Sequence, residues 1–281
     1  MNPIEVNSIK VLLKKSIANL ITIINLILGF SSLVLIGLSL SGIKNYIEIA
    51  CILIFTATFV DVCDGKVARK LGTSGDFGKQ IDSLADIISF CLVPSFLIFY
   101  YSYELTHFDL ISLILVSSLP LVFGAIRLAK FNAYSIQSDG SHYLGLPTPA
   151  NAIFICSSIL FYYQLSNILL VEGLYSSLFI FDFFKKIFFK FYISSENVVI
   201  IVCSISSFLL VSNIKYSKFP KVSFSSNKDN IKNIFGLLIF SVFLFIGIII
   251  KEYQIVMLFF ISYYIISGIL KALISKISGG V

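Results

Sequence analysis

Long apolar stretches, each bounded by a short polar or charged connection, run through almost the whole chain. A helix needs about 20 predominantly apolar residues to cross the hydrocarbon core of a bilayer. Eight stretches are predicted to span the membrane: 17–40, 45–69, 79–103, 109–135, 148–170, 196–213, 231–250 and 252–275. The pattern therefore predicts an all-α fold, a polytopic membrane helix bundle.

The first fifteen residues have a different pattern. Apolar residues alternate there with Lys10, Lys14 and Lys15, which makes the segment basic and amphipathic. Such a segment is typical of a helix that lies in the membrane interface. Residues 1–15 are therefore predicted to form an amphipathic surface helix. For the segment 171–195, which is rich in Phe and Lys, we expect an interfacial helix or an irregular ninth span.

The composition agrees with a membrane protein and excludes several other classes. Of the 281 residues 57% are hydrophobic and 13% are charged, whereas a soluble domain has about 45–50% apolar and about 25% charged residues. A disordered chain would have far fewer apolar residues. Nucleic-acid binding is not expected, because the basic residues lie between apolar spans and form no continuous stripe. With no visible repeat or linker, residues 1–281 are predicted to form a single domain.

The placement of the basic residues predicts an orientation. An even number of spans puts both termini on one side, and 16 of the 21 Lys and Arg residues would lie on that side. Because Lys and Arg favour cytoplasmic connections, both termini are predicted to be cytoplasmic. Only Arg69 and Arg127 are arginines, which suggests that these two positions use the planar fork of the guanidinium group.

Five of the 15 acidic residues fall within one short segment, residues 61–86. Asp61 and Asp64 are three residues apart at the end of the second predicted span, and Asp82 and Asp86 are four apart at the start of the third. On a helix these spacings place each pair on one face. The connection between the pairs contains glycine and must turn. Residues 61–86 are therefore predicted to form a helix hairpin with both pairs at a similar membrane depth.

Four carboxylates facing one another repel, and charges near the bilayer are costly unless they are compensated. Two divalent cations would balance them, and oxygen ligands suit Mg²⁺, Mn²⁺ or Ca²⁺ better than zinc. A pair of such ions suits phosphoryl transfer. Gly65, Ala68 and Gly78 would let a phosphate or a flat group approach the backbone, and Arg69 could bind a phosphate. The fifth acid, Asp76, is interpreted as a cap or loop residue near a helix start.

The same segment fits the pattern D-x2-D-G-x2-A-R-x8-G-x3-D-x3-D at every fixed position. It resembles the signature of the CDP-alcohol phosphatidyltransferase family. The resemblance implies a helical membrane enzyme, usually a homodimer, in which Asp61, Asp64 and Asp82 bind two divalent metal ions. Asp86 would complete the metal site or act as the catalytic base beside Asp82. The residues implied at the cytidine site are Gly65, Ala68, Arg69 and Gly78, and Asn19 in the first span is a further candidate.

Three other segments resemble the phosphatidylserine synthase branch of this family. They are SIANLITIINL at 16–26, GAIRLAKFNAYS at 124–135 and GLPTPAN at 145–151. Ala18 stands where proline is usual in the branch. The resemblance implies transfer of a phosphatidyl group from CDP-diacylglycerol to L-serine in a prokaryotic plasma membrane, with membrane lipids around the site. Arg127, Lys130 and Asn132 are the candidates to bind the acceptor or a phosphate, because arginine binds carboxylates bidentately.

Two other functions fit part of the pattern. A sibling enzyme would use glycerol 3-phosphate or an inositol phosphate, but such acceptors need a denser basic pocket than Arg127 and Lys130 offer. A divalent-cation transporter would place its acids near the bilayer midplane, often within inverted repeats. Here the acids cluster near one membrane face and no repeat is visible, so the sequence favours the phosphatidyltransferase.

Overall fold

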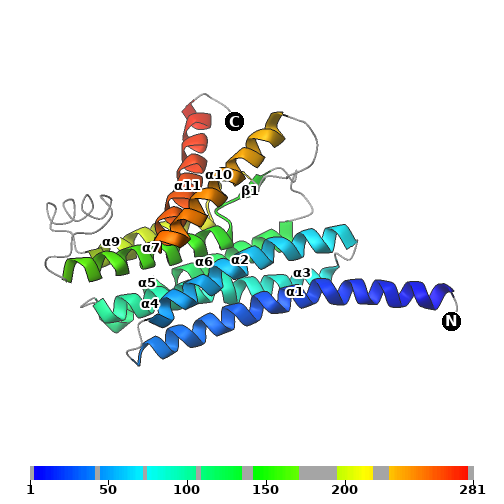
Figure 1. Ribbon diagram of the computed structural model, residues 1–281, viewed down its shortest axis with the longest axis horizontal. Coiled ribbons are helices and arrows are strands. Elements are labelled where there is room, and N and C mark those ends of the chain that lie inside the picture. The colour runs from blue at the N-terminus through cyan, green and yellow to red at the C-terminus, as the bar shows by residue number, and fades with distance from the viewer. Residues whose placement is uncertain are drawn as a thin grey trace. The chain divides into compact units, whose positions relative to one another are not determined.

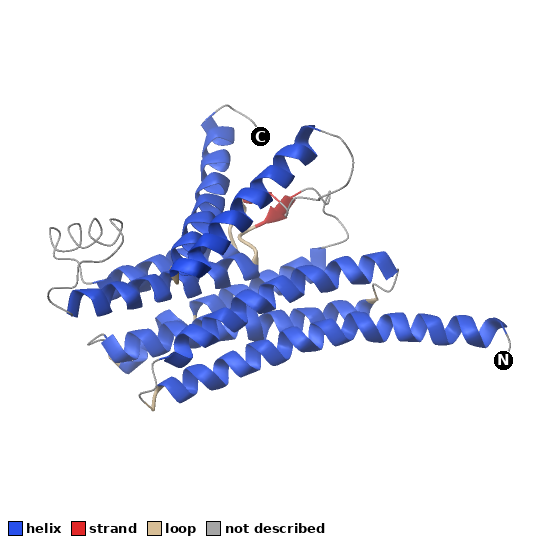
Figure 2. Ribbon diagram, viewed as in Figure 1, coloured by secondary structure: helices blue, strands red, loops and turns tan. Residues whose placement is uncertain are grey.

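The computed structural model describes residues 3–41, 45–71, 75–105, 109–134, 142–170, 195–217 and 228–277. The chain divides into two compact units, Met1–Ala133 and Tyr134–Val281. Figure 1 follows the chain from blue at the N-terminus to red at the C-terminus. The described residues are almost entirely helical, apart from one pair of short strands (Figure 2). The all-α prediction is confirmed.

The first unit is a bundle of helices. They are α1 (Pro3–Ser39), α2 (Asn45–Leu71), α3 (Asp76–Asp86), α4 (Val93–Leu105), α5 (Leu110–Ser117) and α6 (Leu119–Tyr134). A π-helical segment, η1 (Ile87–Leu92), joins α3 to α4 without a break, so these three elements form one long helix. α1 packs along α2 and also contacts α3, η1 and α4, which places α1 beside the segment that carries Asp82 and Asp86.

Small and hydroxyl-bearing residues allow α1 to approach its neighbours closely. The Ser32 hydroxyl donates a hydrogen bond of 3.0 Å to the Ala50 carbonyl on α2. The Ser89 hydroxyl on η1 donates one of 3.0 Å to the Asn25 carbonyl on α1. At Gly29 a Cβ would come within 2.9 Å of the Ser89 Cα. Such close contacts hold helices together in a bilayer, where lipid is as apolar as the side chains.

The N-terminal segment is helical, as predicted, but it is not a separate helix. α1 runs from Pro3 to Ser39 without interruption, so the predicted surface helix 1–15 and the first span belong to one element. The sequence contains no Gly or Pro between residues 4 and 28. Without a helix-breaking residue the two segments continue into each other.

The second unit combines helices with a small sheet. Its elements are β1 (His142–Leu144), α7 (Thr148–Leu170), α9 (Ser195–Leu210), β2 (Lys215–Ser217), α10 (Lys228–Ile250) and α11 (Tyr253–Ile277). α7 packs on α9 and α11, and α10 packs on α11. β1 and β2 are antiparallel, with Tyr143 opposite Tyr216. Tyr216 is buried against Gly268 of α11, and burial raises the pKa of its hydroxyl to about 12.

Five helical segments in the described ranges are long and apolar enough to cross a membrane. They are Asn19–Ser39, Tyr46–Cys63, Phe77–Tyr103, Leu110–Ala133 and Tyr253–Ile277, and they match the first four and the last predicted spans. The shorter apolar helices Val199–Leu210 and Leu238–Ile250 fall inside the sixth and seventh predicted spans. α7 coincides with the fifth. The polytopic helix bundle is confirmed, and the number of crossings, eight, stays a prediction.

Large apolar side chains cover the outer faces of these helices in both units. Phe30 on α1 is 62% exposed, Ile111 on α5 is 71% exposed and Phe259 on α11 is 67% exposed. In water such surfaces would drive aggregation, and extended apolar surfaces of this kind mark contact with a membrane. The exposed face of each unit is therefore suited to lipid.

Candidate active site and metal centre

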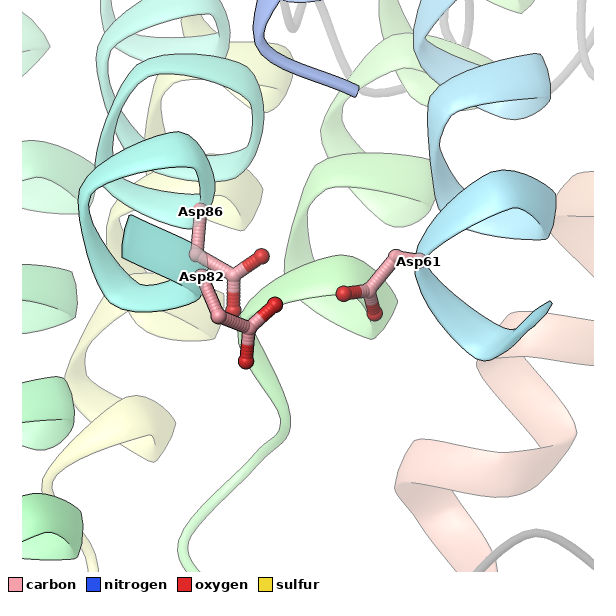
Figure 3. Close-up of side chains that lie close together, drawn as sticks. All are labelled: Asp61, Asp82 and Asp86. Atoms are coloured by element: carbon pink, nitrogen blue, oxygen red, sulfur yellow. The ribbon is translucent and has the colours of Figure 1, made fainter. Parts of the chain in front are cut away.

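Three of the four predicted metal ligands lie together in the first unit. Asp61 comes from α2, whereas Asp82 and Asp86 come from α3. One carboxylate oxygen from each residue lies within 4.8 Å of those from the other two. In Figure 3 the carboxylates of Asp82 and Asp86 lie side by side on one helix, and Asp61 points toward them from its neighbour. The hairpin predicted for residues 61–86 thus brings acids from both of its helices to one place.

The third helix changes its geometry at the acid cluster. Asp82 and Asp86 are one turn apart, so both project from the same face of α3. Asp86 is the last residue of α3 and is 9% exposed. From Ile87 onward the helix is π-helical, and π-helical insertions are frequent at functional sites. Asp86 therefore lies at the junction between the acid-bearing turn and the buried part of the helix.

α1 runs alongside α3 and η1 in the same direction. Near the start of α3, Gly78 lies opposite Asn19 of α1. A Cβ atom placed on Gly78 would be 3.7 Å from the Asn19 Oδ1. Further along, Asn25 and Gly29 meet Ser89. The contacts follow the same order on both helices. Asn19 and Gly78, which were both predicted at the nucleotide site, are thus neighbours at one end of the acid cluster.

α6 is attached to the same long helix by two hydrogen bonds and runs in the opposite direction. The Asn132 Nδ2 donates to the Ser83 Oγ at 2.9 Å, and the Leu121 N–H donates to the Ser95 Oγ at 2.9 Å. Ser83 directly follows Asp82 in the sequence. Asn132, a predicted acceptor residue, therefore reaches α3 within the stretch that carries the acids.

The two basic residues predicted for the acceptor lie in different environments. Arg127 is 8% exposed, and both Arg127 and Asp86 are within electrostatic range of the buried Cys91 on η1. Lys130 is exposed. The structure therefore brings Arg127 close to the buried end of the acid cluster and leaves Lys130 at the surface.

Several predicted features lie outside the described part of the structure. The side chains of Asp64, Gly65, Ala68 and Arg69 are among them, although the α2 backbone that carries them continues from Asp61 to Leu71. The segment 171–195 also lies outside the described residues except for its last residue. Asp76 is the first residue of α3, which agrees with its interpretation as a residue near a helix start.

The donor set fits hard divalent cations. The described cluster consists of carboxylate oxygens alone, which are the ligands preferred by Mg²⁺, Mn²⁺ and Ca²⁺. Three carboxylates so close to one another repel strongly in a partly buried setting, and a bound cation would offset that repulsion. The three aspartates could therefore hold a metal, with Asp64 as the remaining predicted ligand.

Two polar residues that adjoin this site, Asn25 and Ser89, were not predicted from the sequence. Asn25 and Ser89 are both fully buried, and the hydrogen bond between them joins α1 to η1. A signal for Asn25 was present, because it follows Asn19 and Thr22 at intervals of three residues along one face of α1. No comparable signal marked Ser89.

The fold and the site together define an integral membrane protein with an acidic centre suited to divalent cations. A comparison with family models makes this more specific. The model described as CDP-alcohol phosphatidyltransferase matches residues 15–179, and the chain belongs to that family. The match confirms the resemblance seen in the aspartate motif, and it identifies the chain as an enzyme.

Curated relatives of the chain are named as CDP-diacylglycerol–serine O-phosphatidyltransferases or as an archaetidylserine synthase. A CDP-diacylglycerol–serine O-phosphatidyltransferase from Helicobacter pylori is 32% identical over 198 residues, or 70% of each chain. One of that name from Methanocaldococcus jannaschii is 28% identical over 209 residues, 74% of this chain and 77% of the relative. Archaetidylserine synthase from Methanothermobacter thermautotrophicus is 35% identical over 155 residues, 54% of this chain and 61% of the relative.

Proposed function

We propose that the protein transfers the phosphatidyl group of CDP-diacylglycerol to the hydroxyl of L-serine, giving phosphatidylserine and CMP. The observation that carries this proposal is the convergence of Asp61, Asp82 and Asp86 in a member of the CDP-alcohol phosphatidyltransferase family. The names of the relatives support serine as the acceptor.

In this proposal Asp61, Asp64, Asp82 and Asp86 hold two divalent cations, Mg²⁺ or Mn²⁺, and Ca²⁺ also fits the oxygen ligands. When bound, such ions neutralise charge on the transferred phosphoryl group and on the departing CMP. Asp86 takes the proton of the serine hydroxyl as that oxygen attacks phosphorus. Its carboxylate lies beside those of Asp61 and Asp82, which suits this role because a general base must lie within hydrogen-bond reach of the proton that it removes.

The donor would bind toward the N-terminal end of α3. Asn19 and Gly78 are neighbours there, so an amide lies beside a position that has no side chain. Gly65, Ala68 and Arg69 continue this nucleotide site on α2, with Arg69 binding phosphate oxygens through its planar fork. The diacylglycerol chains would remain in the bilayer, which explains an active site on membrane-spanning helices.

The acceptor would bind on the side of the cluster that faces α6. Arg127 is the buried cation there, and a guanidinium group can bind the serine carboxylate bidentately. Asn132 would add a hydrogen bond from its position beside Ser83, and Lys130 would attract anionic groups at the surface.

The family match extends across both compact units, which supports our proposal that residues 1–281 act as one enzymatic domain. The distribution of Lys and Arg supports cytoplasmic termini and a cytoplasmic acid site. A prokaryotic plasma membrane, surrounding membrane lipids and a homodimer are further parts of the proposal, and they rest on the family resemblance.

The test is incorporation of radiolabelled L-serine into lipid by the purified protein, supplied with CDP-diacylglycerol and Mg²⁺ or Mn²⁺. We expect labelled phosphatidylserine and an equal amount of CMP. Glycerol 3-phosphate and an inositol phosphate serve as competing acceptors. Preferred use of either one would replace serine as the acceptor, and absence of CMP release with all three would refute the proposal.

A further inference from the structure

One polar side chain beside the acid site takes no part in the proposed reaction. Asn25 on α1 is 0% exposed, and among the described residues neither its Oδ1 nor its Nδ2 has a hydrogen-bond partner. A buried polar group without a partner destabilises the folded state. An apolar residue would avoid that cost at a fully buried helix position. The amide is therefore expected to form its hydrogen bonds in another state of the protein.

The contacts of α1 place Asn25 next to the buried end of the acid cluster. Asn19 lies opposite Gly78, and Gly29 lies opposite Ser89. Asn25 lies between these two points on α1, and its own carbonyl accepts the hydrogen bond from Ser89. On the neighbouring helix this corresponds to the stretch from Ala85 to Ser89, which includes Asp86. Asn25 is thus about one turn deeper in the bundle than Asp82.

The contacts of α6 place Arg127 at the same level. Its helix is joined to the long third helix through Ser83 at one end and Ser95 at the other. Arg127 lies about midway between the two α6 partners, Leu121 and Asn132, which corresponds to the region of Ser89. A neutral amide and a cation from two different helices therefore lie at the level of the innermost aspartate.

The combination of an amide and a guanidinium group suits an acceptor that carries both a carboxylate and an ammonium group. A carboxamide has an acceptor oxygen and two N–H donors, whereas a guanidinium group has donors only. Arg127 can bind a carboxylate but offers nothing to an ammonium group. The Asn25 Oδ1 can accept a hydrogen bond from an ammonium group and, unlike another aspartate, adds no further negative charge.

We propose that Asn25 binds the ammonium group of the amino-acid acceptor and thereby selects serine over alcohols that lack this group. The inference rests on the proposed function, since it concerns the acceptor of that reaction. Asn25 has no exposed surface, so the acceptor reaches it only if helix packing beside Asp86 opens. The adjoining π-helical turn of η1 is the element that would shift.

The experiment compares L-serine with 3-hydroxypropionate, which is serine without its ammonium group. In Asn25→Leu, which keeps the branching of the side chain but removes its polar atoms, kcat/KM for serine is expected to fall about 10- to 100-fold, the range for losing a hydrogen bond to a charged group. The value for 3-hydroxypropionate and the KM for CDP-diacylglycerol are expected to stay within about twofold of the wild type.

Ser32→Ala provides the matched control, because Ser32 lies on the same helix, is equally buried and makes its hydrogen bond to α2. Ser32→Ala is expected to leave unchanged the ratio of kcat/KM for serine to kcat/KM for 3-hydroxypropionate. Asn25→Ser, which shortens the side chain but keeps it polar, is expected to lose selectivity as Asn25→Leu does. It provides the same test if Asn25→Leu does not accumulate in the membrane.

Three results overturn the inference. One is an unchanged kcat/KM for serine in both Asn25 variants, and another is an equal loss of kcat/KM with both acceptors, which would indicate a purely structural role. The third is a wild-type enzyme that uses 3-hydroxypropionate as well as serine. A wild-type enzyme that transfers phosphatidyl groups but ignores serine refutes the proposed function itself, which distinguishes the two failures.

Discussion

Each compact unit contains a group of polar side chains with buried or partly buried carboxylates, and the two groups surround these carboxylates with different partners. In the second unit Glu252 accepts hydrogen bonds from the Gln164 Nε2 at 2.9 Å and from the Gln254 Nε2 at 2.8 Å. The two amides are also hydrogen-bonded to each other. In the first unit three aspartates converge within 4.8 Å. In the second unit a single carboxylate accepts hydrogen bonds from two neutral amides. In the first unit three carboxylates lie close to one another, so that negative charge is concentrated there.

The difference separates a structural arrangement from the site that we propose binds metal. Burial raises the pKa of the Glu252 carboxyl, and the hydrogen bonds from Gln164 and Gln254 act against that rise. This group is complete with its own side chains. The convergence of Asp61, Asp82 and Asp86 instead concentrates charge that a divalent cation would balance. Substitutions in the two groups should therefore have different consequences, which are given below from the largest expected effect to the smallest.

The largest effect is expected at the acids of α3. Asp82→Asn and Asp86→Asn should each lower CMP release by at least about 10³-fold, because a metal ligand or the proton acceptor is lost. The protein should still insert in the membrane, since asparagine has nearly the same shape. Serine incorporation and CMP release measure the effect.

Asp109→Asn is the matched control for these variants. Asp109 caps α5 by accepting a hydrogen bond from the Ser112 N–H at 3.1 Å, and hydrogen bonds from the Ser112 side chain and from its N–H hold the pKa of the Asp109 carboxyl below the ordinary value. Asparagine caps helices as well as aspartate does, so near-normal activity is expected. Full activity in either Asp82→Asn or Asp86→Asn would show that the cluster is not the active site.

The second largest effect is expected from removal of metal, which should act through the aspartates of the first unit and not through Glu252. A chelator should reduce the activity to background, and added Mg²⁺ or Mn²⁺ should restore it. A metal at about 100 times its dissociation constant should also stabilise the wild type by about 2.7 kcal/mol. This thermal stabilisation should disappear in Asp82→Asn and persist in Glu252→Gln. Equal stabilisation of both variants would place the metal elsewhere.

A smaller effect, on stability alone, is expected at the second group. Gln254 is 5% exposed and donates to both Gln164 and Glu252. Gln254→Leu removes these bonds and should lower the free energy of unfolding by about 1–3 kcal/mol. Denaturation in detergent measures this loss, and the KM values for both substrates should not change. Loss of catalysis without loss of stability would contradict a structural role.

The smallest effect is expected for Glu252→Gln. A pKa raised by folding means that the folded protein holds this proton more tightly than the unfolded chain does. Stability from this group is thus greatest below the pKa of the unfolded glutamate and is lost as the pH rises through the folded pKa. Glutamine does not titrate, so the variant should be less sensitive to pH between acid and neutral conditions. Thermal unfolding at a series of pH values tests this, and a steeper pH dependence would contradict it.

Much of the fold could be predicted because hydropathy is a local property. The boundaries of α7 agree with the fifth predicted span, 148–170, and those of α11 nearly agree with the last one. The 1–15 segment shows the limit of this approach. Its amphipathic pattern predicted a helix correctly, but amphipathicity does not indicate whether a helix ends, and α1 continues into the first span.

The sequence by itself determined the class of protein and the acids that lie together. Spacings of three and four residues put side chains on one helix face, and a short connection brings two such faces near each other, so Asp61, Asp82 and Asp86 could be grouped without a structure. Only the tertiary structure decided that Asn25 and Arg127 lie at the level of Asp86. Their position depends on the register between helices, and that register is set by contacts between distant residues, such as Gly29 with Ser89. Such contacts leave no periodic signal along the chain.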